Sequence, residues 1–313
     1  MSGIEASTTM PRVSGGEASA YAGIAPPLWL VGRGEPGAAG ALLGNRSPAA
    51  AFLMYHSVAD AGPPFLSVPA DVFERQLAAL RRLGWRSGTI ADLRSLLAGE
   101  RLDRPVAFLT FDDGFADNAQ VALPIMLEYG MRPIVFVLPD HLADGAALAW
   151  PELAERQRRH PDVMRSMDWA GVERLVEAGA EIGSHAMTHR SLPTLGPEEL
   201  RDELADSRRR LQQRLGRCDA VAYPFGHWSP AVAAAAAETG YSFAFTAPRD
   251  GQRAVHRFAI PRVAIDQRDD GARFRMKLSG LGRRVLHSPL LPPARRAARR
   301  AGWGVGVRRA RVE

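Results

Sequence analysis

A single cysteine, Cys218, is present among the 313 residues of the chain. One thiol cannot form an internal disulfide, so the sequence excludes a small scaffold held together by disulfides. We interpret Cys218 as a small buried apolar residue. Runs of 18 apolar residues are also missing, so no ordinary membrane-spanning helix is expected. Because 46% of the residues are hydrophobic, the chain can build one large domain with a sizeable core.

The beginning of the chain lacks the pattern of a signal peptide. Glu5 precedes every basic residue, and the most apolar part, residues 21–31, contains Pro26 and Pro27. The sequence therefore favours a cytoplasmic protein, with an extracytoplasmic location left open. Residues 1–48 are rich in alanine, glycine, serine and proline without a sustained period, so we expect them to be disordered.

The positive net charge of the chain, +6, comes from its last residues. Residues 283–313 hold nine arginines and one glutamate, so the rest of the chain is slightly acidic and its charge says little about a substrate. Within the predicted tail, residues 273–313, a helix over 294–301 would place four arginines on one side. Weak contact with an anionic membrane is one interpretation, and a solvated tail is the other. No recognition motif accompanies these arginines, so no nucleic acid partner is expected.

Two adjacent carboxylates follow an apolar strand pattern. Residues 106–111 form this pattern between Pro105 and Gly114, which is typical of a strand buried on both faces in a parallel sheet. Asp112 and Asp113 stand at its carboxyl end, where parallel α/β folds carry their chemistry. Neighbouring carboxylates repel each other, and a bound cation is the usual compensation. The alternative interpretation is a helix cap beside a solvated acid.

Two histidines, His185 and His189, follow another short strand pattern that begins at Glu181. On a helical turn, positions i and i+4 lie on one face, so both imidazoles would reach one ion. A lone histidine is more often structural, but this pair together with the two aspartates favours a shared site. One carboxylate and two imidazoles leave coordination positions open on Zn²⁺ or a similar metal, which is typical of a hydrolytic centre.

Strand patterns alternate with helical patterns along the chain, which predicts a barrel or a doubly wound sheet of the α/β class. Asp71, Thr89 and Asp168 are candidate helix caps. Residues 139–167 show no strong pattern, and long segments of this kind often border a binding cleft. The expected strands are 49–55, 106–111, 133–138, one from 181, 221–223, 241–246 and 262–265, and the expected helices are about 71–84, 89–97, 117–129, 169–178, 198–215 and 229–239.

Four short segments carry a resemblance to a known family. Residues 110–114 (Thr-Phe-Asp-Asp-Gly) and 184–189 (Ser-His-Ala-Met-Thr-His) resemble the first two motifs of the polysaccharide deacetylases, the family named for its NodB-like domain. Residues 222–226 (Ala-Tyr-Pro-Phe-Gly) are similar to the third motif in the form found in poly-N-acetylglucosamine deacetylases, and residues 54–58 (Met-Tyr-His-Ser-Val) also resemble that branch. The resemblance spans roughly residues 50–268.

The resemblance implies a fold and a reaction. The fold would be a distorted, incomplete (β/α) barrel over residues 49–272, and the reaction would be removal of N-acetyl groups from an N-acetylated glycan. The metal would be Zn²⁺, with Co²⁺, Ni²⁺ or Fe²⁺ as alternatives. Its ligands would be Asp113, His185 and His189.

The same resemblance assigns the other roles. Asp112 would act as the general base, and the backbone N–H near Phe225 would stabilise the oxyanion. Many relatives carry an arginine where this chain has Ala222, and we predict that Arg262 supplies the cation instead. A C-terminal Leu-x-His motif, the source of the general acid in many relatives, is missing. His56 is our first substitute, and His256 is the second.

Two other classes of function stay open at this point. One is a glycan-binding domain without catalytic activity, although the intact Asp112 argues against it. The other is a metal-dependent amidase acting on an amide or imide that is not a carbohydrate, because the substrate is selected by loops rather than by metal ligands. The sequence does not indicate an oligomeric state.

Overall fold

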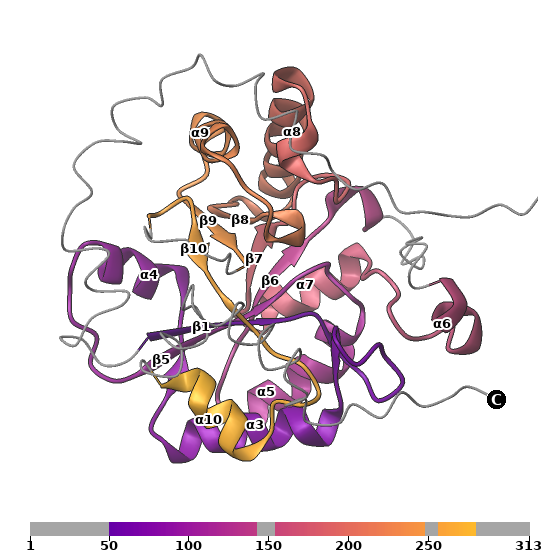
Figure 1. The fold of residues 1–313 in the computed structure, drawn as a ribbon, viewed down its shortest axis with the longest axis vertical. Coiled ribbons are helices and arrows are strands. Elements are labelled where there is room, and N and C mark those ends of the chain that lie inside the picture. Colours follow the sequence, from indigo (N-terminus) through magenta and orange to yellow (C-terminus); the bar gives the residue numbers. More distant parts are fainter. Residues whose placement is uncertain (1–49, 143–153, 248–255, 280–313) are drawn as a thin grey trace, which may run out of the picture.

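The computed structural model describes residues 50–142, 154–247 and 256–279. The predicted disordered segment 1–48 and residues 280–313 of the predicted tail lie outside the described residues. Figure 1 shows a central sheet with helices around it. The helices are α3 (Ala70–Arg82), α4 (Ile90–Leu97), α5 (Leu123–Glu128), α6 (Ala154–Arg159), α7 (Trp169–Glu177), α8 (Pro197–Leu215), α9 (Pro230–Glu238) and α10 (Gly271–Leu278). No helix among the described residues has the length and apolar character needed to cross a membrane.

The main sheet has nine strands, and every pair in it is parallel. Its order is β10-β9-β8-β7-β6-β5-β1-β11, with β4 attached to β5. A second, two-stranded sheet joins β2 (Ser57–Val58) and β3 (Ser67–Val68). The strands of the main sheet are β1 (Ala50–Tyr55), β4 (Arg86–Ser87), β5 (Val106–Phe111), β6 (Ile134–Val137), β7 (Glu181–Ser184), β8 (Ala220–Ala222), β9 (Phe243–Thr246), β10 (Ile260–Pro261) and β11 (Val263–Ala264).

The two edges of this sheet are brought together by one short stretch of chain. β10 pairs with β9 and β11 pairs with β1, and only Arg262 separates β10 from β11. The barrel is distorted at β5, where β4 pairs with the first residues of the strand and β6 pairs with the last. The structure therefore confirms a distorted, nearly closed (β/α) barrel and excludes the open doubly wound sheet.

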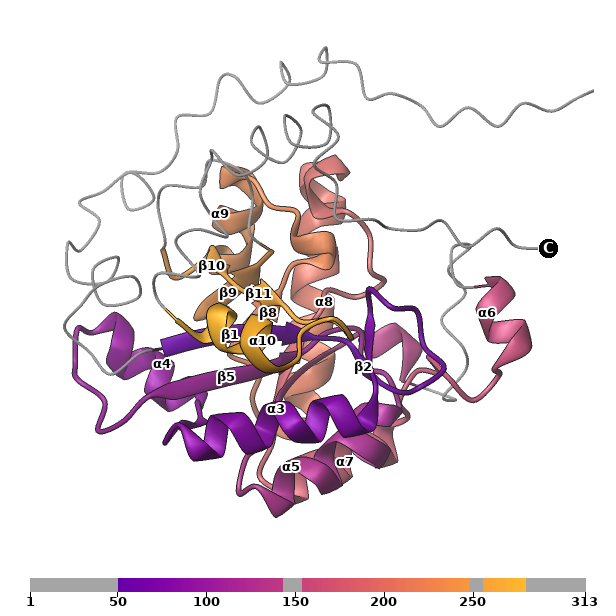
Figure 2. The same ribbon diagram turned by 60° about the horizontal axis from the view of Figure 1, so that its bottom comes forward.

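Alternate residues of the strands face two different cores. An inner cluster contains Phe52, Phe108, Phe136 and Phe245. Residues that point outward from the strands, such as Leu53 and Leu109, pack against the surrounding helices. Each fully buried apolar side chain of this size stabilises the fold by about 1.5–3 kcal/mol. Buried residues of α4 join the inner cluster near the beginnings of β1 and β5, so this helix covers that end of the barrel (Figure 2). The chemistry must therefore lie at the opposite, carboxyl end.

The ends of several helices test the predicted caps. Thr89 and Asp168 cap α4 and α7, as predicted, because each side chain accepts a hydrogen bond from a backbone N–H of the first turn. The prediction for Asp71 was wrong. α3 begins one residue earlier, after Pro69, and the N–H of Ala70 is bound by Asp60.

Two further elements differ from the sequence-based expectation. The helix expected over 117–129 begins with a π-helical turn, η1 (Asn118–Ala122), before α5. At the other end of the domain, α10 crosses the predicted boundary at residue 272. Its Phe274 and Leu278 are buried in the outer core, so the body of the domain continues at least to Leu278.

Candidate active site

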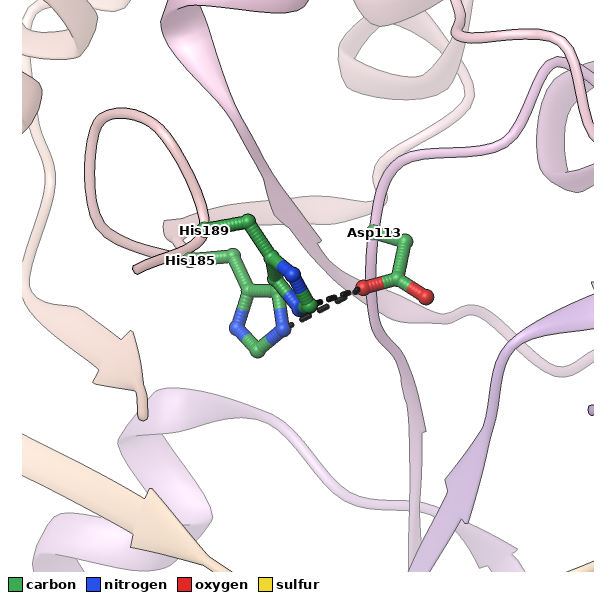
Figure 3. A group of neighbouring side chains, drawn as sticks. All are labelled: Asp113, His185 and His189. Atoms are coloured by element: carbon green, nitrogen blue, oxygen red, sulfur yellow. Dashed lines mark ion pairs between the residues drawn. The ribbon is translucent and has the colours of Figure 1, made fainter. Parts of the chain in front are cut away.

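Three predicted ligands meet at the carboxyl end of the barrel. Asp113 follows β5, and His185 follows β7 two strands away in the sheet. The Asp113 Oδ1 atom lies 3.3 Å from Nε2 of His185 and 3.4 Å from Nε2 of His189. Figure 3 shows both imidazole rings directed at this carboxylate. The cluster therefore unites side chains that are more than 70 residues apart in the sequence.

The spacing of these atoms fits a metal ion. One donor atom from each residue lies within 4.8 Å of the other two. Zinc binds nitrogen and oxygen ligands at about 2.0–2.2 Å, and two ligands of a tetrahedral ion at that distance are about 3.4 Å apart. The separations of Asp113 from the two histidines match this value. One carboxylate and two imidazoles also leave part of the coordination sphere open, as a hydrolytic centre requires.

The hydrogen bonding of His185 supports the same interpretation. Its Nδ1 lies 2.8 Å from the carbonyl oxygen of Ala222, which requires a proton on Nδ1. A neutral imidazole then directs the lone pair of Nε2 at Asp113, an arrangement that needs a cation between them. Burial disfavours the charged form of His185, but the carboxylates of Asp112 and Asp113 outweigh it and raise the pKa.

The two histidines are not brought together by a helical turn, so that part of our prediction was wrong. Residues 185–189 form an irregular loop after β7. Ala186 and His189 have φ angles of 64° and 67°, in the left-handed region that non-glycine residues rarely adopt. Each such residue costs on the order of 1–3 kcal/mol and persists only where its surroundings hold it. The loop must therefore be held by contacts from elsewhere.

Asp112 and Asp113 are equally buried, each about 3% exposed, so neither is a solvated acid. Asp113 also has a positive φ of 70°. Burial opposes ionisation of Asp113, but hydrogen bonds from His185 and His189 outweigh burial and hold its pKa well below the usual range. Asp113 is consequently an anion, as a metal ligand must be.

Asp112 is paired with the arginine that joins the two edges of the sheet. Two nitrogens of the Arg262 guanidinium each donate to one oxygen of Asp112 at 2.6 Å, and one of them also donates to the hydroxyl of Thr110. Burial acts against the charge on Asp112, but Arg262 outweighs it and lowers the pKa. The guanidinium also lies over the rings of Phe136 and Phe245. Arg262, which the sequence analysis selected as a source of positive charge, thus forms an ion pair with Asp112.

His56 follows β1, and two residues of the η1 region hold the backbone around it. The amide of Asn118 donates to the carbonyl oxygen of His56 at 2.7 Å. Asp117 accepts hydrogen bonds from the hydroxyl of Ser57 at 2.6 Å and from the N–H of Val58 at 3.0 Å. Burial raises the pKa of Asp117 to about 6. Asp117 therefore fixes the β1–β2 connection and does not cap the helix that follows it.

The pKa of the His56 imidazole depends on burial and on the charges of the other site residues. Its Nδ1 atom is buried and makes no hydrogen bond within the described part of the chain. Burial lowers the pKa of His56, and the carboxylates of Asp113 and Asp112 oppose this only in part. A lowered pKa favours the neutral imidazole at neutral pH and makes the imidazolium, once formed, a stronger proton donor. The second candidate, His256, packs its ring against Trp228.

Phe225 lies at the outer face of the site. Its ring centroid is 4.5 Å from that of His189, and 58% of the residue is exposed. The backbone there is unusual, because Phe225 has a φ of 57° and the following Gly226 has a φ of 63°. A Cβ atom on Gly226 would collide with Ala247, so only glycine fits there. The third motif therefore places an exposed aromatic ring beside a metal-ligand candidate.

A cavity of about 460 Å³ borders the end of the segment that showed no sequence pattern. The N–H of Met167 bonds to the carbonyl oxygen of Gly114, and the N–H of Ala116 bonds to that of Arg165. This pairing links the segment to the turn directly after Asp113. The cavity is lined by Ala116, Ala119, Gln120, Asp162, Arg165, Ser166, Met167, Asp168, Ala170, Gly171 and Arg174. It contains none of the predicted site residues.

Three residues that contact the site were not found from the sequence: Thr110 bonds to Arg262, Asn118 to the backbone of His56, and Glu203 to the backbone between the two histidines. The sequence places Thr110 in a buried strand and in the first motif but gives it no role of its own, and it places Asn118 and Glu203 in predicted helices. A buried glutamate in a charged amphipathic helix has no distinguishing local signal, because its partners come from a loop elsewhere in the chain. An asparagine after an acidic residue at a helix start is likewise a common pattern.

The fold and this cluster define a class: a (β/α) barrel whose strands carry, at their carboxyl end, an Asp-His-His cluster that could hold a metal ion. Comparison with known proteins finds similarity to polysaccharide deacetylases. A family model described as polysaccharide deacetylase matches residues 99–244. The putative polysaccharide deacetylase YxkH of Bacillus subtilis is 26% identical over 225 residues, which cover 71% of this chain and 73% of that protein.

Solved structures show the same fold. The deacetylase PplD of Streptococcus pyogenes superimposes with a TM-score of 0.61 and 20% identity, over 74% of this chain and 99% of that one. IcaB from Ammonifex degensii superimposes with a TM-score of 0.58 and 22% identity, over 71% of this chain and 94% of that one. The family model thus covers the segment that carries Asp113, His185 and His189.

Proposed function

We propose that this protein is a metal-dependent hydrolase that removes N-acetyl groups from an amino-sugar-containing glycan. The observation that carries the proposal is the division of the aspartate pair. Asp113 faces two imidazoles at distances that suit a shared ion, and Asp112 is held beside it by Arg262. Such a site has a ligand set and a separate carboxylate, and amide hydrolysis needs both.

Asp113, His185 and His189 would hold the metal. The chemistry that a bound divalent ion supplies to such a site is a lowered pKa for water and polarisation of a carbonyl oxygen. Zn²⁺ is the first choice because the donors are one carboxylate and two imidazoles, and Co²⁺, Ni²⁺ and Fe²⁺ are alternatives with similar ligand preferences.

Asp112 is proposed as the general base. Its pKa is lowered, so it is ionised at neutral pH and can accept the proton of the attacking water. Arg262 occupies one direction at each carboxylate oxygen. Each oxygen has a second lone pair, so Asp112 keeps the capacity to accept a proton. Arg262 would thereby orient the base and keep it off the metal.

The remaining roles belong to the rim of the site. His56 would give a proton to the leaving amine, since it directly follows Tyr55, which pairs with Phe111 just before Asp112. The backbone N–H near Phe225 would donate to the oxyanion of the tetrahedral intermediate. The exposed ring of Phe225 would offer an apolar surface next to the reacting group.

A poly-N-acetylglucosamine type of glycan is our first candidate substrate. Its support is the similarity of residues 54–58 and 222–226 to that branch of the family. The competing function is a metal-dependent amidase acting on a non-carbohydrate amide or imide, and it would use the same ligands. A contact of the C-terminal tail with an anionic membrane stays a separate proposal, because those residues lie outside the described ranges.

The test is a deacetylation assay on a panel of N-acetylated oligosaccharides plus one cyclic imide, measured as release of acetate or of ring-opened product. We expect acetate release from at least one oligomer of N-acetylglucosamine, and loss of that activity with a chelator. Turnover of the imide alone would establish the amidase instead. Binding of the oligosaccharides without any turnover would indicate a glycan-binding domain.

A further inference from the structure

The loop between the two histidines has an unusual backbone, and one buried side chain contacts its centre. Ala186 and His189 bracket the loop with positive φ angles. Glu203 lies in the middle of α8, is only 7% exposed, and faces this loop. Its sequence distance from both histidines exceeds ten residues, so only the tertiary structure brings it there.

The carboxylate of Glu203 accepts three hydrogen bonds from two consecutive loop residues. The N–H groups of Met187 and Thr188 both donate to Oε2, at 2.9 and 3.0 Å. The hydroxyl of Thr188 donates to the other oxygen, Oε1. One turn further along α8, Ser207 donates to the carbonyl oxygen of Ala186 at 3.1 Å. The helix therefore fixes the loop through both a carboxylate and a hydroxyl.

These contacts are the main electrostatic compensation for burying Glu203. Within the described part of the chain, Glu203 has no ion pair with a basic side chain. A buried carboxylate is tolerated only where hydrogen bonds satisfy it, and bonds from N–H groups to a charged acceptor are about twice as strong as neutral ones. The carboxylate and the loop thus stabilise each other in a single geometry.

We propose that Glu203 is a positioning residue for the metal site, which holds the loop so that the Nε2 atoms of His185 and His189 both face Asp113 before an ion arrives. The inference rests on the metal site of the proposed function, and it adds a residue that touches neither ion nor substrate. A preorganised ligand set loses less conformational freedom on binding, so removal of Glu203 weakens metal affinity. Outer partners of metal ligands typically contribute about 10–100-fold.

The experiment measures Co²⁺ affinity of the chelator-stripped full chain by titration of the visible absorption of the bound ion. Glu203→Ala is compared with Glu203→Gln and with Asp202→Ala. Asp202 is the exposed neighbour on α8, so its removal deletes the same charge without touching the loop. We expect Glu203→Ala to bind Co²⁺ about 10–100-fold more weakly. Glu203→Gln should stay within about threefold of wild type, because its carbonyl oxygen still accepts both N–H groups and Thr188 can donate or accept.

The outcomes separate the alternatives. Wild-type affinity in Glu203→Ala would overturn the proposal, and so would equal weakening in Glu203→Ala and Asp202→Ala, which would indicate a general charge effect. If Glu203→Ala does not fold, Thr188→Val removes one of the three contacts and leaves α8 intact. A several-fold loss of Co²⁺ affinity in that variant supports the proposal, and no loss contradicts it. No substrate is used, so an inactive wild-type enzyme that binds Co²⁺ would refute the proposed function and leave this inference standing.

Discussion

The site has two halves, the Asp112–Arg262 pair and the cluster of Asp113 with His185 and His189, and they compensate the charge of a buried aspartate in different ways. Asp112 and Asp113 are neighbours, equally buried, and each needs a positive partner. On the arginine side, Asp112 meets a guanidinium that the fold supplies permanently. On the histidine side, Asp113 meets two imidazoles that are uncharged in their ordinary form and so require a proton or a metal. Only the second half can therefore exchange its cation.

This difference gives a physical reason for the aspartate pair. A carboxylate held by a fixed bidentate arginine keeps its orientation and its charge whatever occupies the neighbouring position. A carboxylate beside two histidines is free to bind an ion. If this division is correct, changes on the histidine side should act on metal content, and changes on the arginine side should act on turnover or stability.

The largest effect is expected from the histidine side. The double variant His185→Ala with His189→Ala should lose the divalent ion, because Asp113 alone gives one ligand. Metal content of the purified protein is measured by elemental analysis, and activity is expected to disappear with the metal. Tight binding of one ion by the double variant would contradict the assignment, as would full activity of the wild type in excess chelator.

The second prediction separates the two aspartates. Asp112→Asn should retain the metal and lose turnover by about 100-fold or more, the scale of general-base catalysis. Asp113→Asn should weaken metal binding itself, because an amide oxygen is a poorer ligand than a carboxylate. Metal affinity and turnover are measured on both variants side by side. Equal metal affinity in the two would show that the halves do not differ as described.

The third prediction concerns His56, which follows β1 at the same end of the barrel as the two aspartates. His56→Ala should lower turnover by about 100-fold, at the lower end of the range for a general acid, and leave metal content unchanged. Steady-state kinetics and elemental analysis on the same preparation provide the check. A wild-type rate would transfer the role to His256 or to water.

The smallest effect on turnover is expected from Arg262→Lys. The charge beside Asp112 is kept, but the two parallel hydrogen bonds become one point contact, so unfolding free energy should fall by about 1–3 kcal/mol. Arg262→Met is the contrasting variant, because it leaves Asp112 buried without a partner and should cost about 3–5 kcal/mol. Denaturant unfolding of both variants is the measurement. Equal stability of Lys and Met at this position would show that the ion pair does not matter to the fold.

Local pattern was sufficient to predict much of the chain. The apolar run 106–111 had to be a buried strand, and the carboxylates after it had to lie at the carboxyl edge of a parallel sheet. Thr89 and Asp168 cap helices through bonds to N–H groups three residues away, so neighbouring sequence contains the whole interaction. Each of the four family motifs likewise spans only five or six consecutive residues.

Closure of the barrel and the shape of the histidine loop depend on interactions between distant segments of the chain. Closure of the barrel depends on how β10 and β11 pair, and two-residue strands have too little pattern to reveal it. The loop from His185 to His189 looked helical by spacing, but its shape is set by Glu203 on another element.

The sequence by itself determined which side chains are available for a metal site and at which strand ends they stand, because residue chemistry and strand periodicity are local properties. Only the tertiary structure decided that Arg262 meets Asp112 and that Glu203 holds the histidine loop. Both are buried charges, and a charge is tolerated in the interior only where a partner from another part of the chain satisfies it.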